Sequence, residues 1–391
     1  KANSNIVIGN LPLVKNSETK HILLTGTTGS GKTTLLNELL PQIRKNNEQA
    51  IIVDPTNTFV KTFYDPKTDV ILNPFDVRSA HWLPWNDCTT LSDYDALAKA
   101  FCDGDSLSDP YWENSAKQLF ASALLKTKDK HNIQELLQIL QQKSLKDFCK
   151  FFADTSNAGL ANIDGDKHTA SIRSTLVNKI NCLKHLNANG KFSINKWLEQ
   201  KSGWLFITFA PAERETLKPL VSAWLDIAIT ALMRRDTLIN NDKVWFIVDE
   251  LPALTKVPSL KTALSEGRKY GMCFVATIQN MYQMESIYGH AEACGLLDMF
   301  NTKYFFRVGD GKTADFASRS LGTKEIFETR ESLSYGANSM RDGVNINSIE
   351  QNKSLVLPSE LMTLKSLECF VKLAEHYPIT KLEMEVSKSC M

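Results

Sequence analysis

The N-terminal part of the chain alternates between short apolar runs and longer amphipathic segments. Residues 21–25 form an apolar run that leads into a glycine-rich turn, and in residues 33–44 apolar positions recur at helical spacing. Two further β-branched runs, residues 50–53 and 70–72, are each followed by an Asp-Pro or Asn-Pro pair. Continuous apolar strands between helices are typical of a parallel sheet covered on both faces. The pattern therefore predicts an α/β fold with a mostly parallel sheet.

The pattern changes after Asp76, because helical periodicity dominates until a strand pattern resumes at residues 204–209. We therefore predict that an all-α domain, residues 79–202, is inserted into an α/β domain formed by residues 1–78 and 203–391. The helices predicted within the insertion are residues 91–101, 112–126, 133–141, 145–152 and 169–186.

The α/β pattern continues through the second half of the chain. A long amphipathic helix is predicted at residues 217–235. Residues 330–357 alternate poorly and contain Gly336 and Gly343 in turn-forming pairs, which indicates a hairpin or a loop excursion. The strands predicted in this half are residues 244–248, 273–277, 304–308, 367–373 and 379–386.

Composition narrows the class of protein. The chain has 391 residues, of which 43% are hydrophobic, and this length suits two or three domains with a sizeable core. With 45 basic and 44 acidic residues the net charge is +1, which excludes a histone-like protein but not a locally basic face. The sequence contains no run of 18 or more apolar residues, so no membrane span is predicted. The eight cysteines are scattered without C-x-x-C spacing, so we predict free thiols rather than disulfides or a zinc site.

Charge is unevenly distributed within the predicted insertion. Residues 76–115 contain two basic and eight acidic residues, whereas residues 117–201 contain fourteen basic and seven acidic residues. The basic stretch fits a face for a phosphate backbone, and it equally fits solvated lysines on helix surfaces.

The glycine-rich turn fits the phosphate-binding loop pattern G-x-x-x-x-G-K-[ST] at every required position. Its glycines let successive N–H groups point at phosphate oxygens, and the following helix N-terminus adds partial positive charge. Lys32 is predicted to reach the β- and γ-phosphates, and the Thr33 hydroxyl to bind Mg²⁺. The turn therefore predicts a site for ATP and Mg²⁺. The predicted nucleotide-binding residues are Gly26, Thr27, Thr28, Gly29, Ser30, Gly31, Lys32, Thr33 and Thr34.

Four polar residues in the second half are candidates for the chemistry. Asp249 and Glu250 follow a predicted strand, at the sheet edge where open α/β sheets bind ligands. Asp249 would hold Mg²⁺ through water, and Glu250 would deprotonate the attacking water. Gln279 would touch the γ-phosphate or its water, although a buried glutamine often satisfies only backbone groups. Arg268 would stabilise charge on the γ-phosphate, but a salt bridge explains it at least as well from residues alone.

At these residues the chain resembles the type IV secretion coupling proteins of the TraD/TrwB kind, which are conjugative DNA-transfer ATPases. The resemblance runs over nearly the whole chain, and the combination with a helical insertion is much more specific than the phosphate-binding loop alone. The segments that carry it are residues 20–33, 52–55, 71–74, 192–194, 197–198, 218–220, 222–224, 246–251, 267–269, 279, 358–360 and 367.

The resemblance implies a RecA-like P-loop NTPase domain and a homo-hexamer around a central channel. It implies that Lys32, Glu250, Arg268 and Gln279 are catalytic, with Arg268 acting as a finger from the neighbouring subunit. Close relatives often have arginine before the histidine of the first strand, so the Lys20 found here leaves a nucleotide contact from that position open.

The resemblance also implies a location and partners. An N-terminal membrane anchor is expected to precede the region that begins at Lys1, placing the chain at the cytoplasmic face of the bacterial inner membrane. The expected partners are DNA, the relaxase or relaxosome, and the proteins of the secretion channel.

Two functions remain open from the sequence. The first is an ATP-driven motor that recruits and pumps DNA, with its relaxase, into a type IV secretion channel. The second is a docking receptor for protein substrates in which nucleotide mainly drives assembly. The intact Asp249-Glu250 pair favours hydrolysis, because a pure scaffold does not need Glu250. A chromosome-partition motor is disfavoured by the helical insertion, and a small P-loop kinase by the length.

Overall fold

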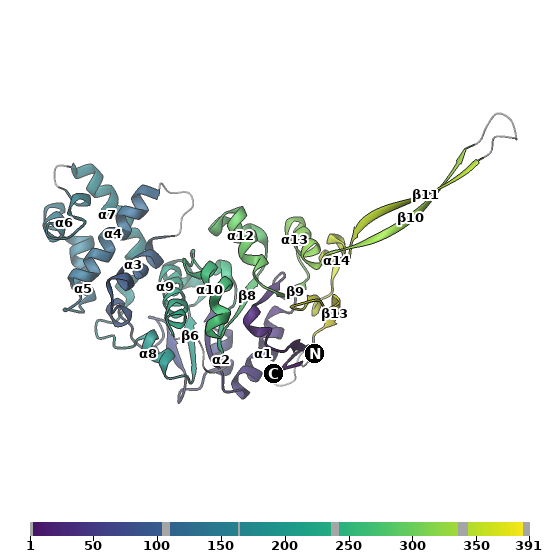
Figure 1. Cartoon of the computed structure of the whole chain (residues 1–391). Helices are drawn as coiled ribbons and strands as arrows, with labels where there is room; N and C mark the ends of the chain where they lie inside the picture. Colours follow the sequence, from purple (N-terminus) through teal and green to yellow (C-terminus); the bar gives the residue numbers. More distant parts are fainter. Residues whose placement is uncertain (1–2, 104–109, 163–164, 236–241, 335–342, 386–391) are drawn as a thin grey trace.

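The computed structural model describes residues 3–103, 110–162, 165–235, 242–334 and 343–385. Figure 1 shows a lobe of helices at one end, a central body in which helices surround a sheet, and a long two-stranded hairpin that extends from the other end.

The central body is built on a nine-stranded sheet with the order β13-β12-β9-β3-β8-β7-β4-β6-β5. From β9 to β5 all neighbouring strands are parallel, and only β12 and β13 at one edge are antiparallel. The parallel strands are buried almost throughout because helices cover both faces. The predicted α/β class is thus confirmed. The strands are β3 (Ile22–Thr25), β4 (Gln49–Asp54), β5 (Val70–Leu72), β6 (Trp204–Thr208), β7 (Val244–Val248), β8 (Met272–Ile278), β9 (Thr302–Phe306), β12 (Glu368–Lys372) and β13 (Thr380–Glu383).

One face of the sheet is covered by α1 (Lys32–Lys45), α2 (Thr58–Phe63) and a hairpin of β1 (Asn3–Ile8) and β2 (Leu11–Val14). The sequence pattern does not predict α2 or this hairpin. The hairpin is held to α1 by Gln42, whose side chain accepts a hydrogen bond from the Val7 N–H at 2.9 Å and donates one to the Val7 carbonyl at 2.7 Å.

The other face packs against the remaining helices of the body. It shares a continuous apolar core with the helical lobe, which is formed by the described residues between 91 and 186. Its longest helix, α9 (Arg214–Met233), has the length and mean hydropathy of a membrane span, but it belongs to this core: 61% of its most apolar 18-residue window is buried. The other helices of the body are α10 (Leu260–Glu266), α11 (Met281–Tyr288), α12 (His290–Asp298), α13 (Gly311–Leu321) and α14 (Pro358–Thr363).

Between β5 and β6 the described residues form helices joined by turns. They contain no strand, apart from an isolated bridge between Trp82 and Phe192. The helix predicted over residues 133–141 changes to a π-helix after Leu137, and the one predicted over residues 169–186 becomes a 3-10 helix after Ile180. The domain boundaries at 78/79 and 202/203 remain predictions. The helices are α3 (Leu91–Cys102), α4 (Pro110–Lys126), α5 (Ile133–Leu137), α6 (Leu145–Phe152), α7 (Asp166–Ile180) and α8 (Ile194–Glu199).

The hairpin that projects from the body consists of β10 (Thr323–Ser334) and β11 (Gly343–Ser354), which pair in register from Thr323–Ser354 to Ser334–Gly343 (Figure 1). The hairpin predicted for this region is therefore present, and it begins earlier than residue 330. Residues 335–342, between the two strands, lie outside the described residues, as does the predicted strand end at Val386.

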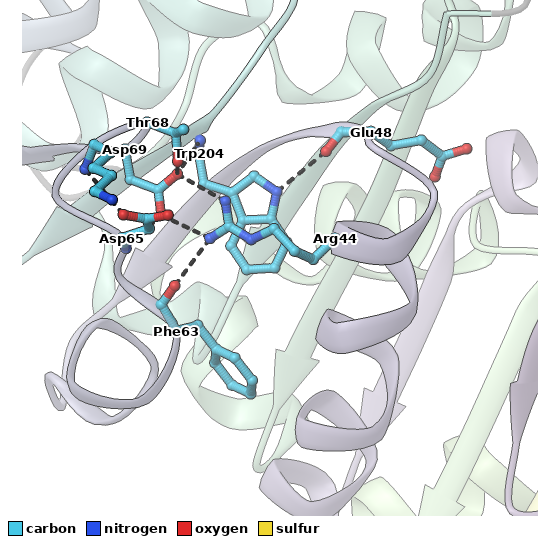
Figure 2. A network of polar contacts seen from close by, with 8 residues as sticks. Arg44, Glu48, Phe63, Asp65, Thr68, Asp69 and Trp204 are labelled. Atoms are coloured by element: carbon cyan, nitrogen blue, oxygen red, sulfur yellow. Dashed lines mark hydrogen bonds and ion pairs between the residues drawn. The ribbon is translucent and has the colours of Figure 1, made fainter.

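A buried ion pair joins α1 to the edge of the sheet (Figure 2). The fully buried Asp69 carboxylate accepts hydrogen bonds from both terminal nitrogens of Arg44, at 2.8 and 2.7 Å, and from the backbone N–H of Asp65 and of Trp204. The Arg44 guanidinium also lies over the Trp204 ring, 3.6 Å from its centroid. Burial raises the pKa of Asp69, but these hydrogen bonds outweigh it and hold the pKa below its ordinary value.

Replacing Asp69 with Asn should lower the free energy of unfolding by about 3 kcal/mol at neutral pH, because the half-buried Arg44 guanidinium and the buried Trp204 N–H lose a charged acceptor. Since the folded-state pKa is depressed, this contribution is present above about pH 4 and is lost as the pH falls through the folded-state pKa. Denaturant unfolding of both proteins from pH 7 to pH 3 measures it. Asp65→Asn is the matched control and should change stability little, because among the described residues the one hydrogen bond to the Asp65 carboxylate comes from the exposed Lys67 N–H.

Candidate active site

A pocket of about 420 Å³ lies at the carboxyl ends of β3, β4, β7 and β8. This is the edge at which an open parallel sheet presents its loops to a ligand. It brings together segments that are far apart in the sequence, including the glycine-rich loop after β3, the acid pair after β7 and Gln279 after β8. The lining residues are Thr28, Gly29, Gly31, Lys32, Thr33, Thr34, Pro55, Thr56, Arg214, Glu215, Lys218, Asp249, Glu250, Pro252, Ala253, Gln279, Gln283, Ser286, Ile287 and Leu367.

The loop of residues 26–31 is shaped by its contact with β9. Gly31 has a φ of 127°, and a Cβ atom there would lie 2.9 Å from the Phe306 ring, so only glycine fits without a shift. The Thr27 N–H donates a hydrogen bond to the Arg307 carbonyl at 2.8 Å. Among the predicted nucleotide-binding residues, Gly26, Thr27 and Ser30 do not line the pocket; they support the loop from behind.

Lys32 begins α1, and its side chain folds back over the loop. Its ammonium group donates hydrogen bonds to the carbonyls of Gly26 and Thr27. Burial lowers the pKa of Lys32, and the nearby carboxylates of Glu250 and Asp249 partly oppose that change. A lysine ammonium held over a glycine-rich loop at a helix N-terminus is the arrangement that binds a polyphosphate.

Asp249 lies at the end of β7, and the Thr277 hydroxyl of the neighbouring strand donates a hydrogen bond to its Oδ1 at 3.1 Å. Among the described residues this is the one donor to the carboxylate. Burial therefore raises the pKa of Asp249 to about 6, with Asp54 adding to the increase and the Thr277 bond and Lys32 opposing it. A poorly compensated carboxylate beside the Thr33 hydroxyl is an all-oxygen set that fits Mg²⁺.

Glu250 has a left-handed backbone conformation, with φ 70° and ψ 74°. Its N–H donates a hydrogen bond to the Thr277 hydroxyl at 2.8 Å, which fixes this strained turn. Its Oε1 is buried and has no hydrogen-bond partner among the described residues. Burial raises the pKa of Glu250, while a hydrogen bond with Gln279 and the charge of Lys32 lower it. A buried carboxylate with a raised pKa is a stronger base than an exposed one, and this suits proton abstraction from water.

Gln279 lies between the acid pair and the loop. The Thr28 hydroxyl contacts its Oε1 at 3.5 Å, and its hydrogen bond with Glu250 places it beside the predicted base. The structure therefore brings Lys32, Thr33, Asp249, Glu250 and Gln279 into one pocket.

Two predicted residues lie elsewhere. Arg268 is exposed in the 3-10 helix Gly267–Tyr270, which precedes β8, so it lies at the amino edge of the sheet, opposite the pocket. Lys20 also precedes its strand, and its ammonium group pairs with Glu375 at 3.1 Å. Neither side chain lines the pocket of its own subunit.

Several residues in or beside the pocket are not predicted from the sequence. Arg214 and Lys218 contribute positive charge from the start of α9. Thr277 does not line the pocket, but its hydroxyl donates a hydrogen bond to the Asp249 carboxylate and accepts one from the Glu250 N–H. Lys218 carries part of the family resemblance, and this signal could have identified it. Arg214 has no motif spacing to reveal it, because α9 follows the helical lobe and β6 in the chain.

A second group of potential metal ligands lies on α11 and α12, where ligand atoms of Glu285, His290 and Cys294 lie within 4.8 Å of one another. Glu285 is already paired with the Lys312 ammonium and with His290 Nδ1, and these contacts lower its pKa. We interpret this cluster as a surface ion-pair network.

Comparison with known proteins gives a consistent result. The sequence model of the family described as "Type IV secretion-system coupling protein DNA-binding domain" matches residues 5–385. The coupling protein TraD of Escherichia coli (strain K12) is 36% identical over 393 residues, which cover 98% of this chain and 55% of TraD. The chain thus spans about half the length of that relative.

Solved structures agree with the sequence comparison. The plasmid coupling protein TrwB in complex with the ATP analogue ADPNP superposes with a TM-score of 0.87 at 28% identity, over 99% of this chain and 90% of TrwB. TrwB in complex with ADP and Mg²⁺ superposes equally well, with the same identity and coverage. Because the family model covers nearly the whole chain and the overlap in fold is as extensive, the chain belongs to the type IV secretion-system coupling proteins.

Proposed function

We propose that the chain is the ATP-hydrolysing motor of a coupling protein that pumps DNA, together with its relaxase, into a type IV secretion channel during conjugation. The observation that carries it is the convergence of the glycine-rich loop and the Asp249-Glu250 pair in one pocket. TrwB, which shares the fold, has been solved with ADP and Mg²⁺ and with an ATP analogue, and this supports the same ligands here.

The pocket residues divide the work of phosphoryl transfer. The loop amides and Lys32 hold the phosphates, while Thr33 and Asp249 hold Mg²⁺, which neutralises charge on the phosphates when bound. Glu250 accepts a proton from the attacking water, and Gln279 orients that water or reports its loss. Arg268 completes the site of the adjacent subunit, and the active form is a homo-hexamer.

The helical lobe is proposed to receive DNA. We divide the chain into a nucleotide-binding domain, residues 1–78 and 203–391, and an inserted all-α domain, residues 79–202. Part of the basic stretch is neutralised, since Lys117 pairs with Asp103 and Lys179 with Glu113. Other basic residues of the lobe are exposed and suited to a phosphate backbone: Lys128, Lys143, Lys146 and Lys150.

The proposed setting is the cytoplasmic face of the bacterial inner membrane, with an anchor in a part of the protein beyond this chain. The remaining partners are the relaxosome and the proteins of the secretion channel. TraD, with which this chain shares 36% identity, is named as a coupling protein, and this supports the assignment.

The test is ATP turnover with and without single- and double-stranded DNA. We expect DNA to raise the rate of ATP turnover. Lys32→Ala should abolish turnover, because the loop loses the cation that reaches the phosphates. Loss of these charge-assisted hydrogen bonds should weaken ATP binding about tenfold to hundredfold. Fluorescence titration with a labelled ATP analogue measures the binding step separately.

The matched control is Lys261→Ala, which removes an exposed lysine on α10 outside the pocket and should leave both readouts unchanged. ATP binding without turnover, at all protein concentrations and with either DNA, would contradict the motor and favour a docking receptor.

A further inference from the structure

The start of α9 forms part of the pocket wall, and its positive charge has no role in the chemistry described above. Arg214 and Lys218 lie one helical turn apart and line the same pocket as the glycine-rich loop. Both belong to the same subunit as Lys32, so they act on a bound ligand without any contribution from a neighbour.

The Arg214 guanidinium lacks a partner within the described part of the chain. It makes no hydrogen bond or ion pair there, and its Nε is buried without an acceptor. Glu250 Oε1 is likewise buried, and it accepts no hydrogen bond from the described residues. The two side chains line the same pocket, yet the described residues show no ion pair between them within 4.0 Å. Since buried polar groups are nearly always paired, an unpaired donor and an unpaired acceptor beside one pocket indicate that a ligand fits there.

The chemistry of that ligand follows from the two side chains. A planar guanidinium fork matches the oxygens of a phosphate group, and a carboxylate beside it matches a water hydrogen. The terminal phosphate of a triphosphate and its attacking water provide these two groups side by side, whereas a diphosphate lacks the terminal phosphate.

We propose that Arg214 donates hydrogen bonds to the terminal phosphate of a nucleoside triphosphate bound in its own subunit, and that Lys218 adds charge beside it. The proposal rests on the nucleotide site proposed above and adds an intrasubunit arginine to Lys32 of the same subunit and to the intersubunit Arg268. Arg214 thereby makes the affinity for triphosphate exceed the affinity for diphosphate.

The position of Arg214 also connects the pocket with the helical lobe. The adjacent Glu215 lines both the nucleotide pocket and a second groove, which is bordered by Asn181, Lys184 and His185 of the lobe. A phosphate held by Arg214 therefore acts on the helix turn that separates the nucleotide from the lobe.

The test compares the affinities of the 391-residue chain for ADP and for a non-hydrolysable ATP analogue, both with Mg²⁺, by titration calorimetry. In Arg214→Ala the affinity for the analogue should fall about tenfold to hundredfold, as expected for the loss of hydrogen bonds to a charged group. The affinity for ADP should stay within about twofold, which also shows that the variant is folded. Thr216→Ala, an exposed position in the same turn that faces the second groove, is the control and should change neither affinity.

The outcomes separate this inference from the function on which it rests. An unchanged ratio of the two affinities in Arg214→Ala would overturn the role of Arg214 while leaving the nucleotide site intact. A wild-type chain that binds neither nucleotide would overturn the proposed function and this inference with it. If Arg214→Ala does not fold, Arg214→Lys carries the comparison, because it keeps the charge and loses the planar fork, and it should still lower the affinity for the analogue selectively.

Discussion

Glu250→Gln should lower ATP turnover about a hundredfold to ten-thousandfold, the range expected for loss of a general base. The amide keeps the size of the side chain but has no carboxylate to accept a proton from water. The strained backbone at φ 70° should be retained, because the hydrogen bond that holds it uses the Glu250 N–H and the Thr277 hydroxyl. Nucleotide affinity should therefore stay within about twofold. Single-turnover hydrolysis and analogue binding measure the two effects separately.

Glu215→Gln is the matched control, since Glu215 is a carboxylate of the same pocket that is exposed at the start of α9. Its turnover should remain close to that of the wild type. A Glu250→Gln variant that hydrolyses ATP at the wild-type rate would show that another group takes the proton, and the assignment of Glu250 would be wrong.

The elements that the sequence predicted well are those whose pattern is local. The parallel strands β4, β6 and β7 are buried along their whole length, and each contains a run of at least four consecutive apolar residues. The hairpin β1–β2 was missed because its strands are short and only partly buried, and its position depends on contacts with Glu38 and Gln42 of α1. Such contacts leave no periodic signal in the sequence.

The same distinction applies to the pocket. The loop and the acid pair each follow a strand, so a motif and the topology of a parallel sheet are enough to bring them together. Thr277 was missed because its role depends on two hydrogen bonds to a neighbouring strand end, which no motif records. Its hydroxyl donates to the Asp249 carboxylate and accepts from the Glu250 N–H. Arg214 reaches the pocket only because β6 lies beside β4 in the sheet, which returns the chain after the helical lobe to the nucleotide edge.

The sheet also explains why Arg268 cannot serve the site of its own subunit. Gln279 follows the carboxyl end of β8 and lines the pocket, while Arg268 precedes the amino end of the same strand. The seven residues of β8, at about 3.3 Å each, separate these ends by about 20 Å, well beyond the reach of an arginine side chain. An exposed arginine at that edge can complete only a site on another subunit, as in a head-to-tail ring.

Arg268→Ala should consequently leave nucleotide binding nearly intact and lower DNA-stimulated turnover about a thousandfold to a hundred-thousandfold, the range for an arginine finger. The decisive measurement mixes two inactive variants, Arg268→Ala and Glu250→Gln. At an interface where the first variant binds ATP and the second supplies its arginine, every group of the site is present. If ring interfaces act independently, an equal mixture should recover about a quarter of the wild-type rate. A mixture that stays inactive would contradict the intersubunit role, because Arg268 of one subunit can restore the site of another only if it acts across the interface. An assembled Arg268→Ala oligomer with normal turnover would contradict it as well.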